Sequence, residues 1–207
     1  MLDNYQKLDN GLIKQVEVTP IQYDFEYSNK YNKLGELSKR MSYLRFGYLI
    51  GALGFTPESI MDVGYGNGDF LNVAKDSVLN CYGSDIVKHH PVPEGCKFAE
   101  SLYSVNVDVV CFFDSLEHFE DIYEIKDLQN KYVYISLPWC HYFSDEWFET
   151  WKHRRINEHL WHFNKEALVN FFKELGYQPI ALSNIEDTIR KHEFSYENIL
   201  TGIFKKQ

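Results

Sequence analysis

A stretch of alternating glycines, "IMDVGYGNGDF" (Ile60 to Phe70), carries the residue pattern best suited to binding a ligand. Gly64, Gly66 and Gly68 occupy every second position, and Asp62 stands just before them. An ordinary surface turn needs only one or two glycines, whereas three allow a ligand to approach the backbone closely. In an α/β sheet, ligands bind where such a turn leads from a strand into a helix.

The dinucleotide fingerprint G-x-G-x-x-G is the first alternative to test against this turn. From Gly64 the sequence reads G-Y-G-N-G-D, so Asp69 stands where the third glycine should fall. Asp62 and Asp69 would also repel a pyrophosphate. The turn therefore favours a ligand that has a cationic group and a ribose, and an NAD-dependent oxidoreductase is kept only as an alternative.

The turn resembles the first motif of the class I, Rossmann-like S-adenosylmethionine-dependent methyltransferases, an acidic residue followed by G-x-G-x-G. "DSLEH" (Asp114 to His118) is similar to the family's motif after its fourth strand, and "EHLWHFNKEALVNFFKELGY" is similar to the region around its late helix. Asp85 ends the second expected strand, where the family places an acidic residue on the ribose hydroxyls. The resemblance covers about residues 60–206 and is closest to the small-molecule branch. It implies S-adenosyl-L-methionine as the cofactor.

The resemblance also implies a role for each matching residue. The glycines would admit the methionine and ribose portions, and the acidic residue before them would hold the ammonium or order the turn. Asp85 would hold the ribose, Asp114 would lie beside the methionine tail, and Glu100 or Ser101 would lie near the adenine. Tyr65 could pack over the cofactor or cap the turn. The cofactor-binding candidates are Asp62, Gly64, Tyr65, Gly66, Gly68, Asp85, Ile86, Glu100, Ser101, Asp114 and Ser115.

Catalysis of methyl transfer consists mainly of aligning nucleophile, methyl group and sulfur, and such positioning contributes about 7–11 kcal/mol. A general base helps where the nucleophile is a hydroxyl. The candidate bases His141, His159 and His162 follow the fifth expected strand, and the last two could share a helical face. We favour His159, and expect the rate to rise through the usual histidine pKa near 6.5. His118 is expected to be structural.

No metal site is expected, because no cysteine or carboxylate stands at ligand spacing from the candidate histidines. The acceptor is expected to be a small metabolite or sugar, methylated on oxygen rather than nitrogen or carbon. Arg154 and Arg155 could meet an anionic group on it or form a solvated face. The tryptophans either pack or line an acceptor pocket; they are Trp139, Trp147, Trp151 and Trp161. A catalytically inactive cofactor- or ligand-binding module of the same fold is a further alternative.

Short apolar runs and strand–helix alternation predict an α/β fold, a three-layer αβα sandwich with a mainly parallel seven-stranded sheet and a C-terminal antiparallel hairpin. The expected strands are Ile60 to Val63, Cys81 to Ile86, Cys96 to Glu100, Val107 to Phe113, Tyr132 to Leu137, Gln178 to Asn184 and Asn198 to Lys206.

Helices are expected between these strands and before them. A helix over Tyr31 to Leu53 has one apolar face, made of Leu34, Leu37, Met41, Leu44 and Tyr48. Others cover Asp69 to Leu79 and a stretch that Asn164 caps and Gly176 ends. Residues 1 to about 30 are expected to form an arm or lid. Residues 1–55 thus form an N-terminal arm and helix, and 56–207 form the Rossmann-like methyltransferase domain.

The charge composition of the chain limits the classes of partner that it is expected to bind. The chain has 207 residues with a formal net charge of −9 and a sequence pI near 5.3, which predicts neither nucleic acid nor a membrane as partner. Four widely spaced cysteines without a C-x-x-C pair, and the lack of a signal-like N-terminus, predict a cytoplasmic protein. Oligomeric state is left open.

Overall fold

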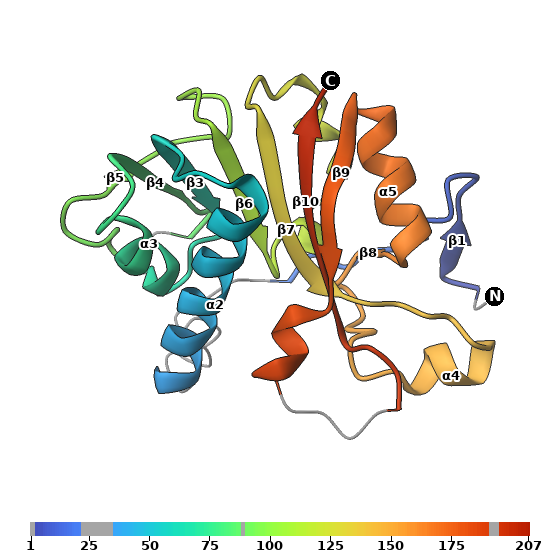
Figure 1. Ribbon diagram of the computed structural model, residues 1–207. Helices are drawn as coiled ribbons and strands as arrows, with labels where there is room; N and C mark the ends of the chain where they lie inside the picture. The colour runs from blue at the N-terminus through green and yellow to red at the C-terminus, as the bar shows by residue number, and fades with distance from the viewer. Residues whose placement is uncertain (1–2, 22–34, 88–89, 191–194) are drawn as a thin grey trace.

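The computed structural model describes residues 3–21, 35–87, 90–190 and 195–207, which build a seven-stranded sheet with helices packed on both faces (Figure 1). In spatial order the strands are β5 (Lys97–Phe98), β4 (Asn80–Ser84), β3 (Ser59–Val63), β6 (Val109–Phe113), β7 (Tyr132–Pro138), β10 (Ile199–Lys206) and β9 (Tyr177–Ser183).

The first five strands in this order run parallel to one another, and β10 is antiparallel to both β7 and β9. The predicted fold class, including its antiparallel hairpin, is confirmed. Because the strands from β5 to β7 are parallel, their carboxyl ends meet at one edge of the sheet, and the glycine turn after β3 lies at that edge.

Continuous apolar runs form the central strands because both faces of the sheet are covered. β6 reads VVCFF and is buried throughout. Successive strand side chains point to opposite faces, so Val110 and Phe112 enter one core with α5 (Lys165–Glu174), whereas Cys111 and Phe113 enter the other with α2 (Gly35–Leu53) and α3 (Asp69–Ala74).

Helix α5 forms as its sequence predicts. The side chain of Asn164 accepts a hydrogen bond from the Ala167 amide at 2.8 Å, and Leu168 and Phe171 are fully buried against the sheet. Gly176 follows the helix with a φ of 81°, a conformation that glycine adopts at little cost.

The predictions for α2 and α3 need correction. The part of the predicted first helix before Gly35 lies outside the described residues, and Leu37, assigned to its buried face, is 38% exposed. The buried side holds Met41 and Leu49 together with Arg45, which packs there because buried carboxylates pair with it. α3 ends at Ala74 instead of reaching Leu79, since the chain turns there: the Ser77 and Val78 amides both donate to the Ala74 carbonyl.

A second, three-stranded sheet was not predicted. Its antiparallel strands are β1 (Tyr5–Lys7), β2 (Ile13–Gln15) and β8 (Trp161–His162). Within the predicted arm, residues 5–15 are therefore a hairpin joined to the late part of the chain; residues 22–30 lie outside the described part. His159 and His162 do not share a helical face, because this segment is extended. A short helix that was also missed, α4 (Asp145–Thr150), follows β7.

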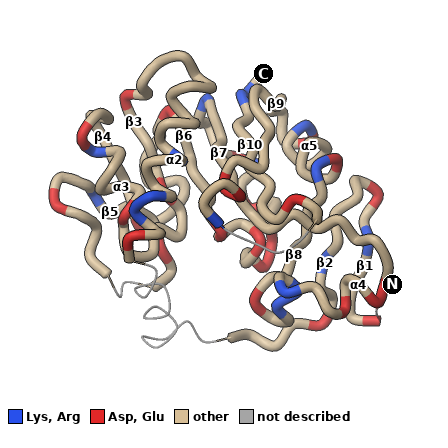
Figure 2. Tube along the Cα trace, turned by 60° about the horizontal axis from the view of Figure 1, so that its bottom comes forward, with Lys and Arg blue, Asp and Glu red and all other residues tan. Residues whose placement is uncertain are grey.

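Three 3₁₀ segments complete the fold: η1 (Leu116–His118), η2 (Ile122–Asp127) and η3 (Ile185–Thr188). Among the described helices, none has the length and apolar character required to cross a membrane. In the view of Figure 2, Lys and Arg are dispersed among Asp and Glu and do not gather on one face.

Candidate functional site

The turn after β3 has the backbone geometry that its glycines predict. Gly64, Gly66 and Gly68 have φ values of 76°, 53° and 78°, in the region that side chains disfavour. A Cβ on Gly64 would lie 2.9 Å from the Cβ of Ser115, and one on Gly68 would lie 2.8 Å from Pro93. A Cβ on Gly66 would meet no atom within 4 Å. The outer glycines are thus required by packing, whereas Gly66 faces open space.

Two buried polar side-chain atoms beside this turn have no hydrogen-bond partner among the described residues. Asp62 is 3% exposed, and its Oδ1 atom accepts no hydrogen bond. Burial is the main cause that raises the pKa of Asp62 to about 7; Arg45 opposes this shift and Asp85 contributes to it. The hydroxyl of Ser115, next to Gly64, is also buried and unpaired. Such groups are rare in folded proteins and fit a site that a polar ligand completes.

Asp85 is the first residue after β4 and faces the glycine turn. Its Oδ2 atom accepts a hydrogen bond from the Gly66 amide at 3.2 Å, and its Oδ1 atom accepts one from the Val87 amide at 3.0 Å. The next residue, Ile86, is 82% exposed. The carboxylate and an apolar side chain therefore stand together at the end of β4, where the sequence places the ribose contact.

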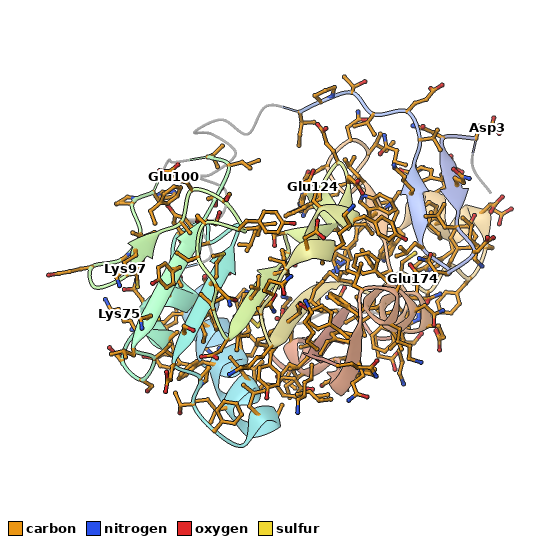
Figure 3. All side chains as sticks on the ribbon, turned by 90° about the horizontal axis from the view of Figure 1, so that it is seen from above. Asp3, Lys75, Lys97, Glu100, Glu124 and Glu174 are labelled. Carbon is orange, nitrogen blue, oxygen red and sulfur yellow. The ribbon has the colours of Figure 1, made fainter. Side chains whose placement is uncertain are left out.

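The remaining candidates near β4 and β5 differ in burial. Tyr65 points into the core, where its ring packs against Phe98 and its hydroxyl donates to the His90 carbonyl. These contacts indicate that Tyr65 stabilises the glycine turn from the core side. Glu100 and Ser101 follow β5, and both are exposed. Glu100 lies on the side of the molecule that carries β5, opposite the side that carries Glu174 of α5 (Figure 3).

Asp114, which follows β6 with a φ of 52°, belongs to a partly buried ion network whose most buried member is Glu186. Arg45 of α2 approaches the Asp114 carboxylate at 3.1 Å and the Glu186 carboxylate of η3 at 2.6 Å. Arg190 pairs with both acids as well, at 2.8 Å from Glu186. Ser136 of β7 donates to Glu186. The network thus joins α2, the end of β6, β7 and η3.

The network holds its carboxylates ionised. Burial alone would raise the pKa of Asp114, but Arg190 and Arg45 outweigh it and hold that pKa well below its usual range. In the same way, Arg45 and Arg190 overcome the effect of burial on Glu186 and lower its pKa. The Asp114 carboxylate therefore pairs with two arginines. Its expected contact with the methionine portion of the cofactor remains a prediction. The network was missed by sequence reasoning; the one available signal was Arg45 within the otherwise apolar stretch from Tyr43 to Phe55.

The three candidate bases lie in different surroundings. His141 is stacked between Trp139 and Phe143, at ring-centroid distances of 5.4 and 5.2 Å, and its Nε2 atom lies 2.8 Å from the Glu197 carbonyl oxygen. The ring of Trp147 also contacts His141 edge-on. His141 is thus held in an aromatic cluster after β7.

His162 is buried in a different cluster, with Tyr5, Phe148 and Trp151 around it. Burial lowers its pKa to about 3, with a contribution from Arg154. Its ring packs β8 against Tyr5 of the N-terminal hairpin, and its assignment as a base remains a prediction. The guanidinium of Arg154 lies over the rings of Tyr5 and Phe148, 5.8 and 5.9 Å from their centroids. Arg155 pairs with Glu158 at 2.7 Å.

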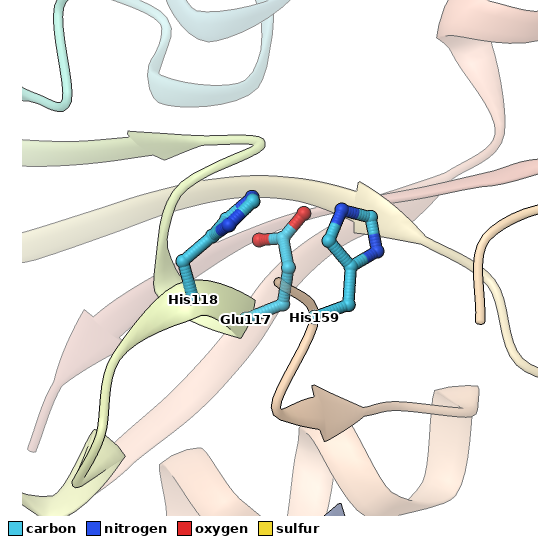
Figure 4. Close-up of side chains that lie close together, drawn as sticks. All are labelled: Glu117, His118 and His159. Carbon is cyan, nitrogen blue, oxygen red and sulfur yellow. The ribbon is translucent and has the colours of Figure 1, made fainter. Parts of the chain in front are cut away.

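His159 is the candidate that the fold brings to the motif after β6. Its ring lies 4.7 Å from that of His118, and Glu117 lies beside both (Figure 4). Burial is the main cause that lowers the pKa of His159 to about 2, and the nearby His118 and Arg155 contribute to the same shift. The expected titration near pH 6.5 is therefore wrong, and a group that holds a proton so weakly is a poor general base. The assignment of His159 as base remains an untested prediction.

Comparisons with known proteins agree with this geometry. The family model described as a methyltransferase domain matches residues 33–182. A chain of the complex between the Haloferax volcanii Trm112 methyltransferase activator and the putative methyltransferase superposes with a TM-score of 0.60 at 15% identity, covering 89% of this chain and 99% of that one. No match was found among curated proteins.

Two further solved structures carry ligands. Magnesium protoporphyrin IX methyltransferase from Synechocystis PCC 6803, with bound S-adenosylhomocysteine, has a TM-score of 0.59 at 12% identity over 91% of this chain and 90% of its own. The 1,6-didemethyltoxoflavin-N1-methyltransferase of Burkholderia thailandensis, with its substrate and S-adenosylhomocysteine, has a TM-score of 0.58 at 13% identity over 99% of both chains. At these identities, the likeness establishes the fold.

Proposed function

Because the chain belongs to the class I methyltransferase domain family, we propose that it transfers the methyl group of S-adenosylmethionine to an oxygen atom of a small metabolite or sugar. The observation that carries this proposal is the glycine turn, in which Gly66 faces open space and Asp62 and Ser115 keep unpaired buried polar atoms. These groups suit a ligand with a cationic amine and hydrogen-bonding oxygens.

The residues of the turn divide the work of binding. The Asp62 carboxylate would attract the ammonium of the methionine portion, and Asp85 would accept hydrogen bonds from the ribose hydroxyls, in a charge-assisted geometry. Ile86 would cover an apolar face of the adenine. When bound, the cofactor supplies an activated methyl group on a sulfonium. The chain itself contributes alignment, which lowers the barrier without forming a covalent enzyme intermediate.

An acceptor panel tests the proposal. The protein is incubated with S-adenosylmethionine that carries an isotopically labelled methyl group and with small hydroxylated, amino and carbon-nucleophile acceptors, and the products are measured by mass spectrometry. We expect label on an oxygen acceptor together with S-adenosylhomocysteine. Label on nitrogen would contradict the oxygen assignment. Binding of S-adenosylhomocysteine without turnover would favour the inactive module.

The raised pKa of Asp62 predicts pH-dependent cofactor binding. Below its pKa of about 7, Asp62 is neutral in the free protein, and binding of an ammonium must first displace its proton. Affinity for S-adenosylhomocysteine should therefore rise with pH, by up to about tenfold per unit below the pKa, and level off above it. Calorimetry between pH 5.5 and about 8 measures this dependence.

Two variants serve as controls for the pH dependence. Asp62→Asn should bind more weakly at pH 8, by about one to a few kcal/mol, with little change as the pH falls. Asp76→Asn removes an exposed carboxylate after α3 and should keep the parent profile. A parent affinity that does not change with pH would remove Asp62 from the ammonium site.

A further inference from the structure

Glu117 of η1 carries a buried carboxyl group that has no hydrogen-bond partner among the described residues. Its side chain is 1% exposed, and neither Oε1 nor Oε2 accepts a hydrogen bond from any described residue. Burying a carboxylate in this way costs free energy unless a cation or a donor completes it. Nothing in the proposed cofactor site uses this group, so its surroundings indicate what it holds.

Two imidazole rings flank the Glu117 carboxylate. His118 follows it in η1, and His159 comes from the segment before β8. One ligand atom from each of the three side chains lies within 4.8 Å of the others, and the three side chains point toward one common space (Figure 4). This combination of two imidazoles and one carboxylate is a set of donors that first-row transition metals prefer.

Each ring has one nitrogen already occupied by backbone. The Nδ1 atom of His159 donates to the His153 carbonyl at 2.9 Å, which leaves Nε2 as a lone-pair donor. His118 makes a hydrogen bond with the backbone of Glu158. Metal-binding histidines are commonly oriented by such a bond to the second nitrogen, because it fixes the tautomer and the ring plane.

The two segments that carry these side chains are joined by backbone hydrogen bonds. The Leu160 amide donates to the Glu117 carbonyl at 2.8 Å, and the His118 amide donates to Ser115 at 3.1 Å. The His159 amide donates to Arg155 at 2.8 Å. The three donors are thus held in place before any ion arrives.

We propose that Glu117, His118 and His159 bind one divalent transition-metal ion, such as Zn²⁺, Mn²⁺ or Co²⁺. With metal–ligand bonds of about 2.0–2.2 Å in tetrahedral geometry, the ligand atoms stand about 3.3–3.6 Å apart, so two atoms at the 4.8 Å limit need to close by about 1.2–1.5 Å when the ion binds. This set departs from the sequence expectation of no metal, which rested on spacing along the chain, where Glu117 and His159 are far apart.

The position of the ion suggests a role in activating the methyl acceptor, and this role rests on the proposed function. Glu117 lies two residues after Ser115, which touches the glycine turn. Three protein ligands leave coordination positions open, where an acceptor hydroxyl could bind and lose its proton more readily. That proton would leave to solvent, while the new O–CH₃ bond forms as the S–CH₃ bond breaks. No histidine base would then be needed.

Metal titration of the full chain tests the site. After treatment with a chelator, the protein is titrated with Co²⁺, Zn²⁺, Mn²⁺ or Mg²⁺, and binding is followed by calorimetry and thermal unfolding, with visible absorption for Co²⁺. We expect one transition-metal ion per chain, a raised Tm, and Co²⁺ bands of nitrogen and oxygen ligands without the intense bands of thiolate. Mg²⁺ should bind far more weakly.

Variants show which residues bind the ion. Glu117→Gln and His159→Ala should each weaken binding by at least about a hundredfold, since loss of an outer partner alone costs up to that amount. Glu120→Gln removes an exposed acid from the same segment and should bind like the parent. Glu117→Gln replaces a buried carboxyl group, neither oxygen of which accepts a hydrogen bond from a described residue, with a neutral amide of the same size, so its metal-free Tm should equal or exceed that of the parent.

Outcomes for the ion and for the cofactor are separable. A parent chain that binds no transition metal, or a Glu117→Gln variant that binds it as tightly as the parent, overturns the metal site. S-Adenosylhomocysteine binding is measured on the same samples: metal binding without it would overturn the proposed function and leave the ion site standing. Binding of S-adenosylhomocysteine without metal binding would overturn the metal site and leave the proposed function standing.

Discussion

Gly66→Val should lose affinity for S-adenosylhomocysteine by at least about a hundredfold, roughly 2.7 kcal/mol, while the protein stays folded. The physical reason is that a Cβ at this position meets no protein atom within 4 Å and would project into the space assigned to the cofactor. Calorimetry measures the affinity, and circular dichroism measures the fold.

A matched control separates loss of ligand space from backbone strain. Gly54 follows α2 with a φ of 75°, and a Cβ there likewise meets nothing within 4 Å. Gly54→Val should therefore suffer a similar conformational cost but bind the cofactor as the parent does. Equal affinity of Gly66→Val and Gly54→Val would mean that the cofactor does not lie over Gly66.

Glu186→Gln should lower the free energy of unfolding by about 3–5 kcal/mol. Glu186 is fully buried and pairs with both Arg45 and Arg190, so its loss leaves two guanidinium groups with only Asp114 as a counter-ion. Urea unfolding followed by tryptophan fluorescence gives the difference, provided that the slope with urea is unchanged.

An exposed ion pair provides the contrast. Lys131 approaches Asp108 at 3.4 Å with its side chain 75% exposed, and Lys131→Ala should cost less than about 1 kcal/mol. If Glu186→Gln were no more destabilising than Lys131→Ala, the ion network would contribute no more than a surface pair. Its proposed role in joining α2 to the sheet would then be wrong.

Local patterns explain why the fold class and the cofactor turn could be predicted from sequence. The glycines after β3 and the acidic residue that ends β4 act on their immediate neighbours, and a βαβ arrangement brings them together without further information. The cap at Asn164 is equally local, since it bonds to an amide three residues away.

Long-range pairing explains what was missed. Residues 5–15 are polar and weakly patterned, and they form strands because β2 pairs with β8, which lies far away in the sequence. His159 was considered with its sequence neighbour His162, but its spatial neighbours are Glu117 and His118. Arg45 belongs to a buried helix face only because Glu186 lies opposite it. None of these partners can be identified by spacing.

The order of the strands has a consequence for synthesis of the chain on the ribosome. β10 is made after β7 and β9, yet it lies between them and pairs with both. Until residues 199–206 leave the exit tunnel, β7 presents an unpaired apolar edge, and β9 cannot join the sheet. Such an edge is a template for pairing with other chains. The nascent protein is therefore most exposed to aggregation in the seconds before β10 emerges, and a binding chaperone would act in that interval.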